Sequence, residues 1–164
     1  MCNWFIFILY FFWINSYSYV FINRVWGSRS RKIYASYQFF LYTLFGSFFV
    51  LLSILFIYYN KGSSLFDFFL FSSFNEYREF IIWLLLFIGL SVKVPIIPFH
   101  IWLPEAHVEA PTPGSVILAG ILLKLGTYAM FRFLLINFNI IINDFIFFIL
   151  MIAIIGFTYS SMVA

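Results

Sequence analysis

Charged residues are scarce in this chain of 164 residues: 9% are Asp, Glu, Lys or Arg, while 65% are hydrophobic. A soluble domain carries about 25% charged residues, so a water-soluble fold of this composition would expose a very large apolar area. The composition therefore predicts a protein whose solvent is the bilayer. Only helices or a closed barrel satisfy every backbone polar group there. Barrel strands alternate apolar and polar residues, whereas the apolar runs here are continuous, so we expect an all-α polytopic membrane fold.

Cysteine is nearly absent. The single residue, Cys2, excludes an internal disulfide and a metal site built from several cysteines. The N-terminus also lacks the basic stretch and the small-residue cleavage site of a signal peptide, because the apolar run from Trp4 continues into further aromatic residues. We therefore expect the first apolar segment to be retained as a membrane span.

Five apolar segments are long enough to cross a bilayer, which requires about 20 residues. The third is interrupted by Pro95 and Pro98, and proline removes a backbone donor and clashes with the preceding turn. A broken helix is tolerated in a membrane only where protein or water covers the freed carbonyls, and such breaks recur at the ion sites of transporters. The predicted spans of this single membrane domain, residues 1–164, are 4–23, 37–59, 79–103, 113–135 and 140–162.

The loops differ in charge. Basic residues gather after the first span, at Arg24, Arg29, Arg31 and Lys32, and such residues favour the side from which insertion occurs. The 24–32 loop is therefore expected in the matrix or cytoplasm and the 60–79 loop on the opposite side. By alternation, the loop 104–111 returns to the side of the first loop.

Two lysines lie inside predicted spans. Lys93 adjoins the proline break, and Lys124 lies mid-way along the fourth span, which is predicted to be an unbroken helix. A lysine at the bilayer centre costs about 2.5–3.5 kcal/mol of insertion free energy, which indicates a functional or structural role for each of these residues. A lysine removed from water can exchange its proton near neutral pH, which favours a proton relay. The alternative is a structural lysine paired with a carboxylate of a neighbouring helix.

Four further ionisable residues follow the break. His100 and His107 titrate in the range that a proton path needs, although both could be plain hydrogen-bonding histidines. A pair of haem ligands is disfavoured because the two histidines lie seven residues apart across Pro104. Glu105 and Glu109 are predicted as loop carboxylates at the mouth of a proton path, or as residues that stabilise the start of the fourth span.

Residues 93–115, KVPIIPFHIWLPEAHVEAPTPGS, resemble the signature of the antiporter-like subunits of respiratory complex I. The continuation at 116–128, VILAGILLKLGTY, narrows the resemblance to subunit 4 of that complex. Subunit 5 and the multi-subunit sodium/proton antiporters share the Trp-Leu-Pro core but have a histidine-bearing helix instead of the lysine-bearing one. A subunit of such an antiporter is therefore an alternative that the segment 114–132 disfavours. The resemblance covers nearly the whole chain and is most specific between residues 93 and 132.

The resemblance implies residue roles. Lys93 matches the central proton carrier on the broken helix, and Lys124 matches the lysine that connects toward the neighbouring channel. His100 and His107 match histidines of the polar path along the membrane. The implied function is proton translocation across the mitochondrial inner membrane, coupled to electron transfer from NADH to ubiquinone.

The resemblance also implies what the chain does not carry. NADH, FMN, the iron–sulfur clusters and ubiquinone bind elsewhere in the complex, so no cofactor or metal site is expected here. The chain would act as an enzyme only within the complex. Its partners are the other membrane-arm subunits, membrane lipids and a chain supplying the remaining helices, because the full subunit is longer than this central fragment.

One departure from the family concerns a glutamate that partners the first lysine. Alignment through Trp26 and Gly27 places Trp13 at that position, and no carboxylate occurs in the first span. Either another chain supplies the acid, or the channel has lost it. The second possibility makes the chain a structural scaffold of complex I that no longer conducts protons.

Overall fold

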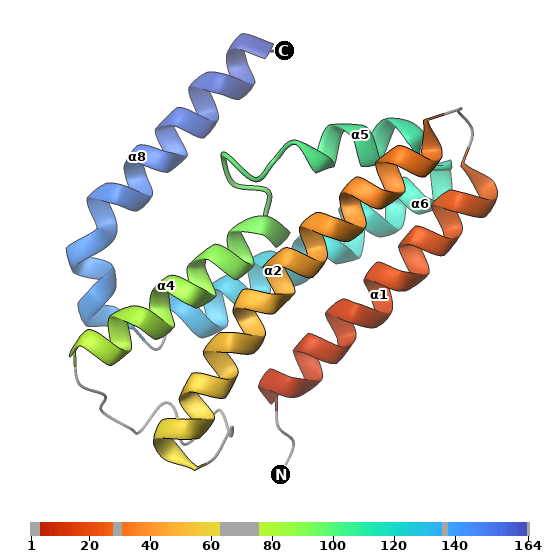
Figure 1. Cartoon of the computed structure of the whole chain (residues 1–164). Coiled ribbons are helices and arrows are strands. Elements are labelled where there is room, and N and C mark those ends of the chain that lie inside the picture. Colours follow the sequence, from red (N-terminus) through yellow and green to blue (C-terminus); the bar gives the residue numbers. More distant parts are fainter. Residues whose placement is uncertain (1–3, 28–30, 63–75, 136–137, 164) are drawn as a thin grey trace.

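The structure is a computed structural model that describes residues 4–27, 31–62, 76–135 and 138–163, and these residues form helices and turns without any strand. The helices follow one another as a bundle with one long outlying member (Figure 1). In chain order they are α1 (Trp4–Trp26), α2 (Lys32–Lys61), α4 (Glu76–Lys93), α5 (Trp102–Glu109), α6 (Thr112–Ile117), η1 (Leu118–Leu122), α7 (Leu123–Ala129), η2 (Met130–Leu135) and α8 (Asn139–Val163).

Four helical segments of the described chain are long and apolar enough to cross a membrane: Ile6–Trp26, Lys32–Asn60, Thr112–Leu135 and Ile141–Val163. A further long helix, α4, is not among these four and forms the first part of the predicted span 79–103. It carries Glu76, Arg78 and Glu79 in its first turn and Lys93 in its last. The prediction of an all-α polytopic membrane fold is confirmed, and the 60–79 loop, which includes Asp67, falls largely outside the described residues.

The helices pack through α2, which lies between α1 and α4. The crossing of α2 and α4 is tight at Gly46 and Gly89, because a Cβ built on either glycine would come within 2.9 Å of the other's carbonyl oxygen. Small residues allow such close backbone approach in membrane helices. Glycine at these positions therefore sets the distance between the two helices.

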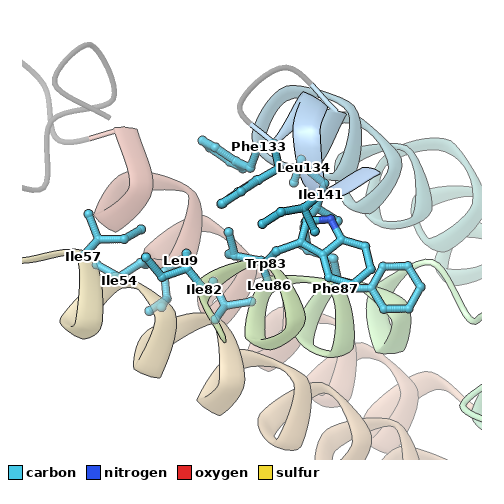
Figure 2. Close-up of a cluster of buried hydrophobic side chains, with 14 of the residues drawn as sticks. Leu9, Ile54, Ile57, Ile82, Trp83, Leu86, Phe87, Phe133, Leu134 and Ile141 are labelled. Carbon is cyan, nitrogen blue, oxygen red and sulfur yellow. The ribbon is translucent and has the colours of Figure 1, made fainter. Parts of the chain in front are cut away.

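One apolar cluster joins α1, α2, α4, η2 and α8, together with Ala129 at the end of α7 (Figure 2). Trp83 of α4 lies at its centre and is 2% exposed. Its indole stacks on Phe145 of α8 with ring centroids 5.2 Å apart. Other members come from the remaining elements, namely Leu9 of α1, Ile54 and Ile57 of α2, and Phe133 and Leu134 of η2. The cluster fixes the N-terminal end of α4 against the rest of the bundle.

Two sequence predictions are corrected by the helix boundaries. The span 113–135 is not an unbroken α-helix, since π-helical turns at η1 and η2 flank the short helix α7 that carries Lys124. Residues 104–109, predicted as loop, belong to α5. Pro104 is accommodated in the first turn of α5, where its missing N–H has no helical partner to lose.

Candidate functional site

Lys93 is the last residue of α4 and is 7% exposed. Its Nζ lies over the ring of Phe12 in α1, 5.0 Å from the ring centroid. On another side, Gly126 of α7 approaches so closely that a Cβ there would lie 3.2 Å from the Lys93 Cβ. Three helices that are distant in the sequence thus enclose one lysine.

The partner of Lys93 in the described chain is an aromatic ring and not a carboxylate. The residue of α1 that faces the ammonium is Phe12, whereas Trp13 is 38% exposed. Trp13, which the alignment places at the position of the family's glutamate, therefore does not lie over the ammonium; the residue before it on the helix does, about 100° of rotation away. A cation over a ring face is held by the ring quadrupole, so Phe12 stabilises the charged form of Lys93 without adding a charge.

The predicted break follows Lys93 directly and is confirmed. Between α4 and α5, the Ile96 N–H donates to the Ser91 carbonyl at 3.0 Å and bypasses that of Val92. The indole N–H of Trp102 donates to the Val92 carbonyl at 3.1 Å. One carbonyl freed by the break is thus covered by protein, as a broken membrane helix requires. Sequence reasoning did not assign Trp102 this role, although it lies in the Trp-Leu-Pro motif.

Lys124 lies on the surface of the described chain. Residues two apart on a helix face different directions, and it is Gly126 of the same helix that packs on Lys93. Lys124 therefore points away from Lys93, so the two lysines share a region of the fold without facing each other. Its flanking turns η1 and η2 are π-helical, a distortion that is frequent at functional sites.

The two histidines occupy different surroundings. His100 lies in the break, where its ring meets that of Tyr159 in α8 edge-on with centroids 5.0 Å apart. Its Nδ1 atom is buried without a hydrogen bond from the described residues. His107 lies on α5 and is half-buried. Both follow Lys93 along the chain, but the structure does not place them in one cluster.

A pocket of about 450 Å³ lies between the start of α2 and α5 and is lined by Arg31, Tyr34, Glu105 and Glu109, among others. Glu109 is 7% exposed, and one carboxylate oxygen of each glutamate is buried without a hydrogen bond among the described atoms. Neither glutamate caps α6, because no side chain forms a cap hydrogen bond there. The pocket also shows that Arg31 and the start of α2 meet α5 at one end of the bundle; the side of the membrane on which this end lies stays a prediction.

Residues 3–164 match the family described as NADH:quinone oxidoreductase/Mrp antiporter, TM. NADH-ubiquinone oxidoreductase chain 4 of Marchantia polymorpha is 55% identical over 141 residues, which cover 86% of this chain and 28% of that protein. NADH-quinone oxidoreductase subunit M of Rickettsia conorii is 46% identical over 166 residues, 99% of this chain and 33% of that protein.

A solved structure of respiratory complex I also contains a similar chain. One chain of respiratory complex I from Thermus thermophilus with bound NADH has a TM-score of 0.68 and 29% identity, covering 79% of this chain and 28% of that chain. The chain thus spans about a third or less of the length of these relatives. Because the match extends over residues 3–164, the chain belongs to the NADH:quinone oxidoreductase/Mrp antiporter family of multi-pass membrane proteins, and the resemblance to chain 4 of complex I is confirmed.

Proposed function

We propose that this chain contributes to proton translocation as a central part of subunit 4 of complex I, in the mitochondrial inner membrane. Translocation would be coupled to electron transfer from NADH to ubiquinone, whose redox cofactors lie in other subunits. The other membrane-arm subunits and a chain carrying the remaining helices of subunit 4 are its proposed partners. The observation that carries the proposal is a lysine buried at a helix break, which nothing in a purely structural bundle requires.

The residues have separate proposed roles. Lys93 loads and releases the proton, since it is enclosed by α1, α4 and α7 at the point where α4 ends. His100, in the break, and His107, on α5 beside the glutamates of the pocket, extend the proton path from Lys93. Lys124, which faces away from the bundle, passes the proton to a neighbouring channel outside this chain.

A structural scaffold that does not conduct is the second candidate. It is favoured because the partner of Lys93 in the described chain is the ring of Phe12, and because the resemblance places Trp13 at the position of the family's glutamate. A carboxylate supplied by a further chain near Lys93 would remove this objection. The two candidates differ in whether Lys93 changes its protonation state during turnover.

The test is Lys93→Met in the assembled complex, because methionine keeps the length of the side chain and removes the ammonium. We expect normal assembly and a lower number of protons pumped per electron. Lys32→Met makes the same chemical change at the start of α2, outside the proposed path, and should leave the ratio unchanged. An unchanged ratio in Lys93→Met would show that the chain is a scaffold.

A further inference from the structure

One face of α1 is buried and polar along half of the helix. Phe12, Ser16, Tyr19 and Asn23 follow at spacings of four, three and four residues, which places them on a single side of a helix. Ser16 is 7% exposed, and Tyr19 and Asn23 are each 1% exposed. Polar side chains are costly at such depth in a membrane protein, and those that occur there face the bundle interior.

The same helix carries each of these residue types on its outer side as well. Ser18 and Tyr17 are exposed and Asn15 is partly exposed. The two serines make equivalent bonds, because Ser16 donates to the Phe12 carbonyl at 2.8 Å and Ser18 to the Ile14 carbonyl at 2.9 Å. Polarity alone therefore does not distinguish the inner face; its burial and its neighbours do.

The inner face connects two parts of the site. At one end, Phe12 covers the ammonium of Lys93. Toward the other end, the Tyr19 hydroxyl donates to the carbonyl of Ala106, the residue between Glu105 and His107. Asn23 lies against Gly114 at the start of the fourth span. The eleven residues from Phe12 to Asn23 rise by about 16 Å along the helix axis, so the face links the depth of Lys93 to the level of the pocket.

The groups on this face have free hydrogen-bonding capacity. Both polar atoms of the Asn23 amide are buried and form no hydrogen bond of ordinary geometry with the described residues, although the amide adjoins the Tyr19 hydroxyl. The hydroxyl oxygens of Ser16 and Tyr19 each donate to a carbonyl and can still accept. Buried polar groups of this kind are ordinarily satisfied by bound water.

We infer that Ser16, Tyr19 and Asn23 line a water-filled route by which protons reach Lys93 from the pocket between α2 and α5. The inference rests on the proposed function of Lys93. A proton from the aqueous phase protonates the Glu109 carboxylate, whose oxygen is buried and unpartnered at the pocket. It then moves along ordered water, each water molecule releasing one proton as it accepts another, and the last transfer converts the Lys93 amine into its ammonium.

The three residues act as positioning residues, because they hold the water and do not themselves need to ionise. Tyr19 is already fixed by its bond to Ala106 and by Phe39, whose ring centroid lies 4.6 Å away. Asn23 offers both a donor and an acceptor at the pocket end, and Ser16 offers an acceptor one turn from Phe12. A purely structural face of α1 would gain stability if Asn23 were apolar, since its amide is unpaired.

The experiment compares inner and outer residues of α1 in the assembled complex. The inner variants are Ser16→Ala, Tyr19→Phe and Asn23→Leu, and their matched controls are Ser18→Ala, Tyr17→Phe and Asn15→Leu. We expect Asn23→Leu and Tyr19→Phe to lower the protons pumped per electron to the same level as Lys93→Met, while electron transfer continues and the controls pump normally. Asn23→Ser, which again offers a hydroxyl, should restore part of the loss.

Two results would overturn the inference. The first is an equal number of protons pumped per electron by the inner and outer variants. The second is a lower number in Asn23→Leu that is not raised in Asn23→Ser. Tyr19→Phe retains the ring that packs on Phe39, so it tests the route even if Asn23→Leu reduces assembly. Lys93→Met separates the two hypotheses, because a normal ratio in that variant overturns the proposed function itself, whereas loss there with normal inner variants overturns only the route.

Discussion

Lys93 and Phe12 form the pair on which the site depends. The ammonium lies 5.0 Å from the ring centroid, within the distance at which a cation and a ring attract each other. A carboxylate at this place would add a second group that gains and loses protons, with titrations that are coupled to those of the lysine. A ring has no proton to exchange, so under the proposed function a charge change at Lys93 would not be tied to a change on its α1 neighbour.

Replacing Phe12 by leucine should lower the stability of the assembled complex, because the attraction between the Lys93 ammonium and the ring is lost. The expected coupling between the two positions is about 0.5–2 kcal/mol, the range for a cation over a ring. It is measured by a double-mutant cycle with Lys93→Met, which separates the pair from the packing of the ring. Phe11→Leu, at the neighbouring exposed position, serves as the control and should show no coupling to Lys93. A coupling of zero for Phe12 would mean that the ring only fills space.

The break between α4 and α5 is the element that holds Lys93 in place. In an uninterrupted helix the Val92 carbonyl would accept from the N–H of Ile96, but that N–H is bonded to Ser91. Trp102 takes over the acceptor at Val92 from the first turn of α5. The indole also meets Phe39 of α2 edge-on, with centroids 5.3 Å apart. The break is therefore a defined structure that depends on a residue ten positions away.

Trp102→Phe should loosen the break without disturbing the bundle. The phenyl ring can still pack on Phe39, but the buried Val92 carbonyl loses its donor, which costs about 1–3 kcal/mol. Local opening should then raise the hydrogen exchange of the amides in residues 94–101 by roughly tenfold or more. Trp13→Phe is the matched control, because it makes the same change on α1 at a residue that is 38% exposed, away from the break. Unchanged exchange in Trp102→Phe would mean that the break does not need this bond.

The break was predictable from sequence because proline has a fixed backbone geometry and no N–H. Pro95 and Pro98 predict a break at this point whatever the tertiary structure. The π-helical turns η1 and η2 were not predictable, since a hydrogen bond from i+5 instead of i+4 is made by the same apolar residues that form an α-helix. Lys124 was therefore correctly found within a helical span but wrongly assigned to an unbroken helix.

The site was predictable where chemistry alone identifies a residue. A lysine in an apolar run is conspicuous, and Lys93 is indeed buried. Its aromatic partner was not predictable, because Phe12 and Trp13 are both apolar and the motif that sets the alignment lies a dozen residues further along α1. A shift of one residue, about 100° of helix rotation, exchanges one neighbour for the other. The function of Lys93 and Lys124 stays a prediction until pumping is measured.

At the scale of the whole molecule, α8 differs from the other helices. It lies at the edge of the bundle (Figure 1) and touches it along one side, through Phe145 on α4 and Tyr159 on His100, while most of its other side chains are exposed. Ile154, Phe157 and Met162 are among its exposed apolar side chains. Such a surface is stable next to lipid or next to other apolar helices. The matched relatives are about three times as long as this chain, so their further helices are candidates to cover it.

The arrangement of the ends predicts the topology in the membrane. Tyr34, at the start of α2, and Val108, on α5, both line the pocket at one end of the bundle. Tyr59 lies near the other end of α2, about 37 Å away for 25 residues of helix, and is 89% exposed. We expect Tyr34→Cys and Val108→Cys to react with an impermeant thiol reagent from one side of the membrane, and Tyr59→Cys from the opposite side. Cys2→Ser provides a cysteine-free background, and modification of Val108→Cys and Tyr59→Cys from the same side would contradict a bundle in which α2 crosses the membrane.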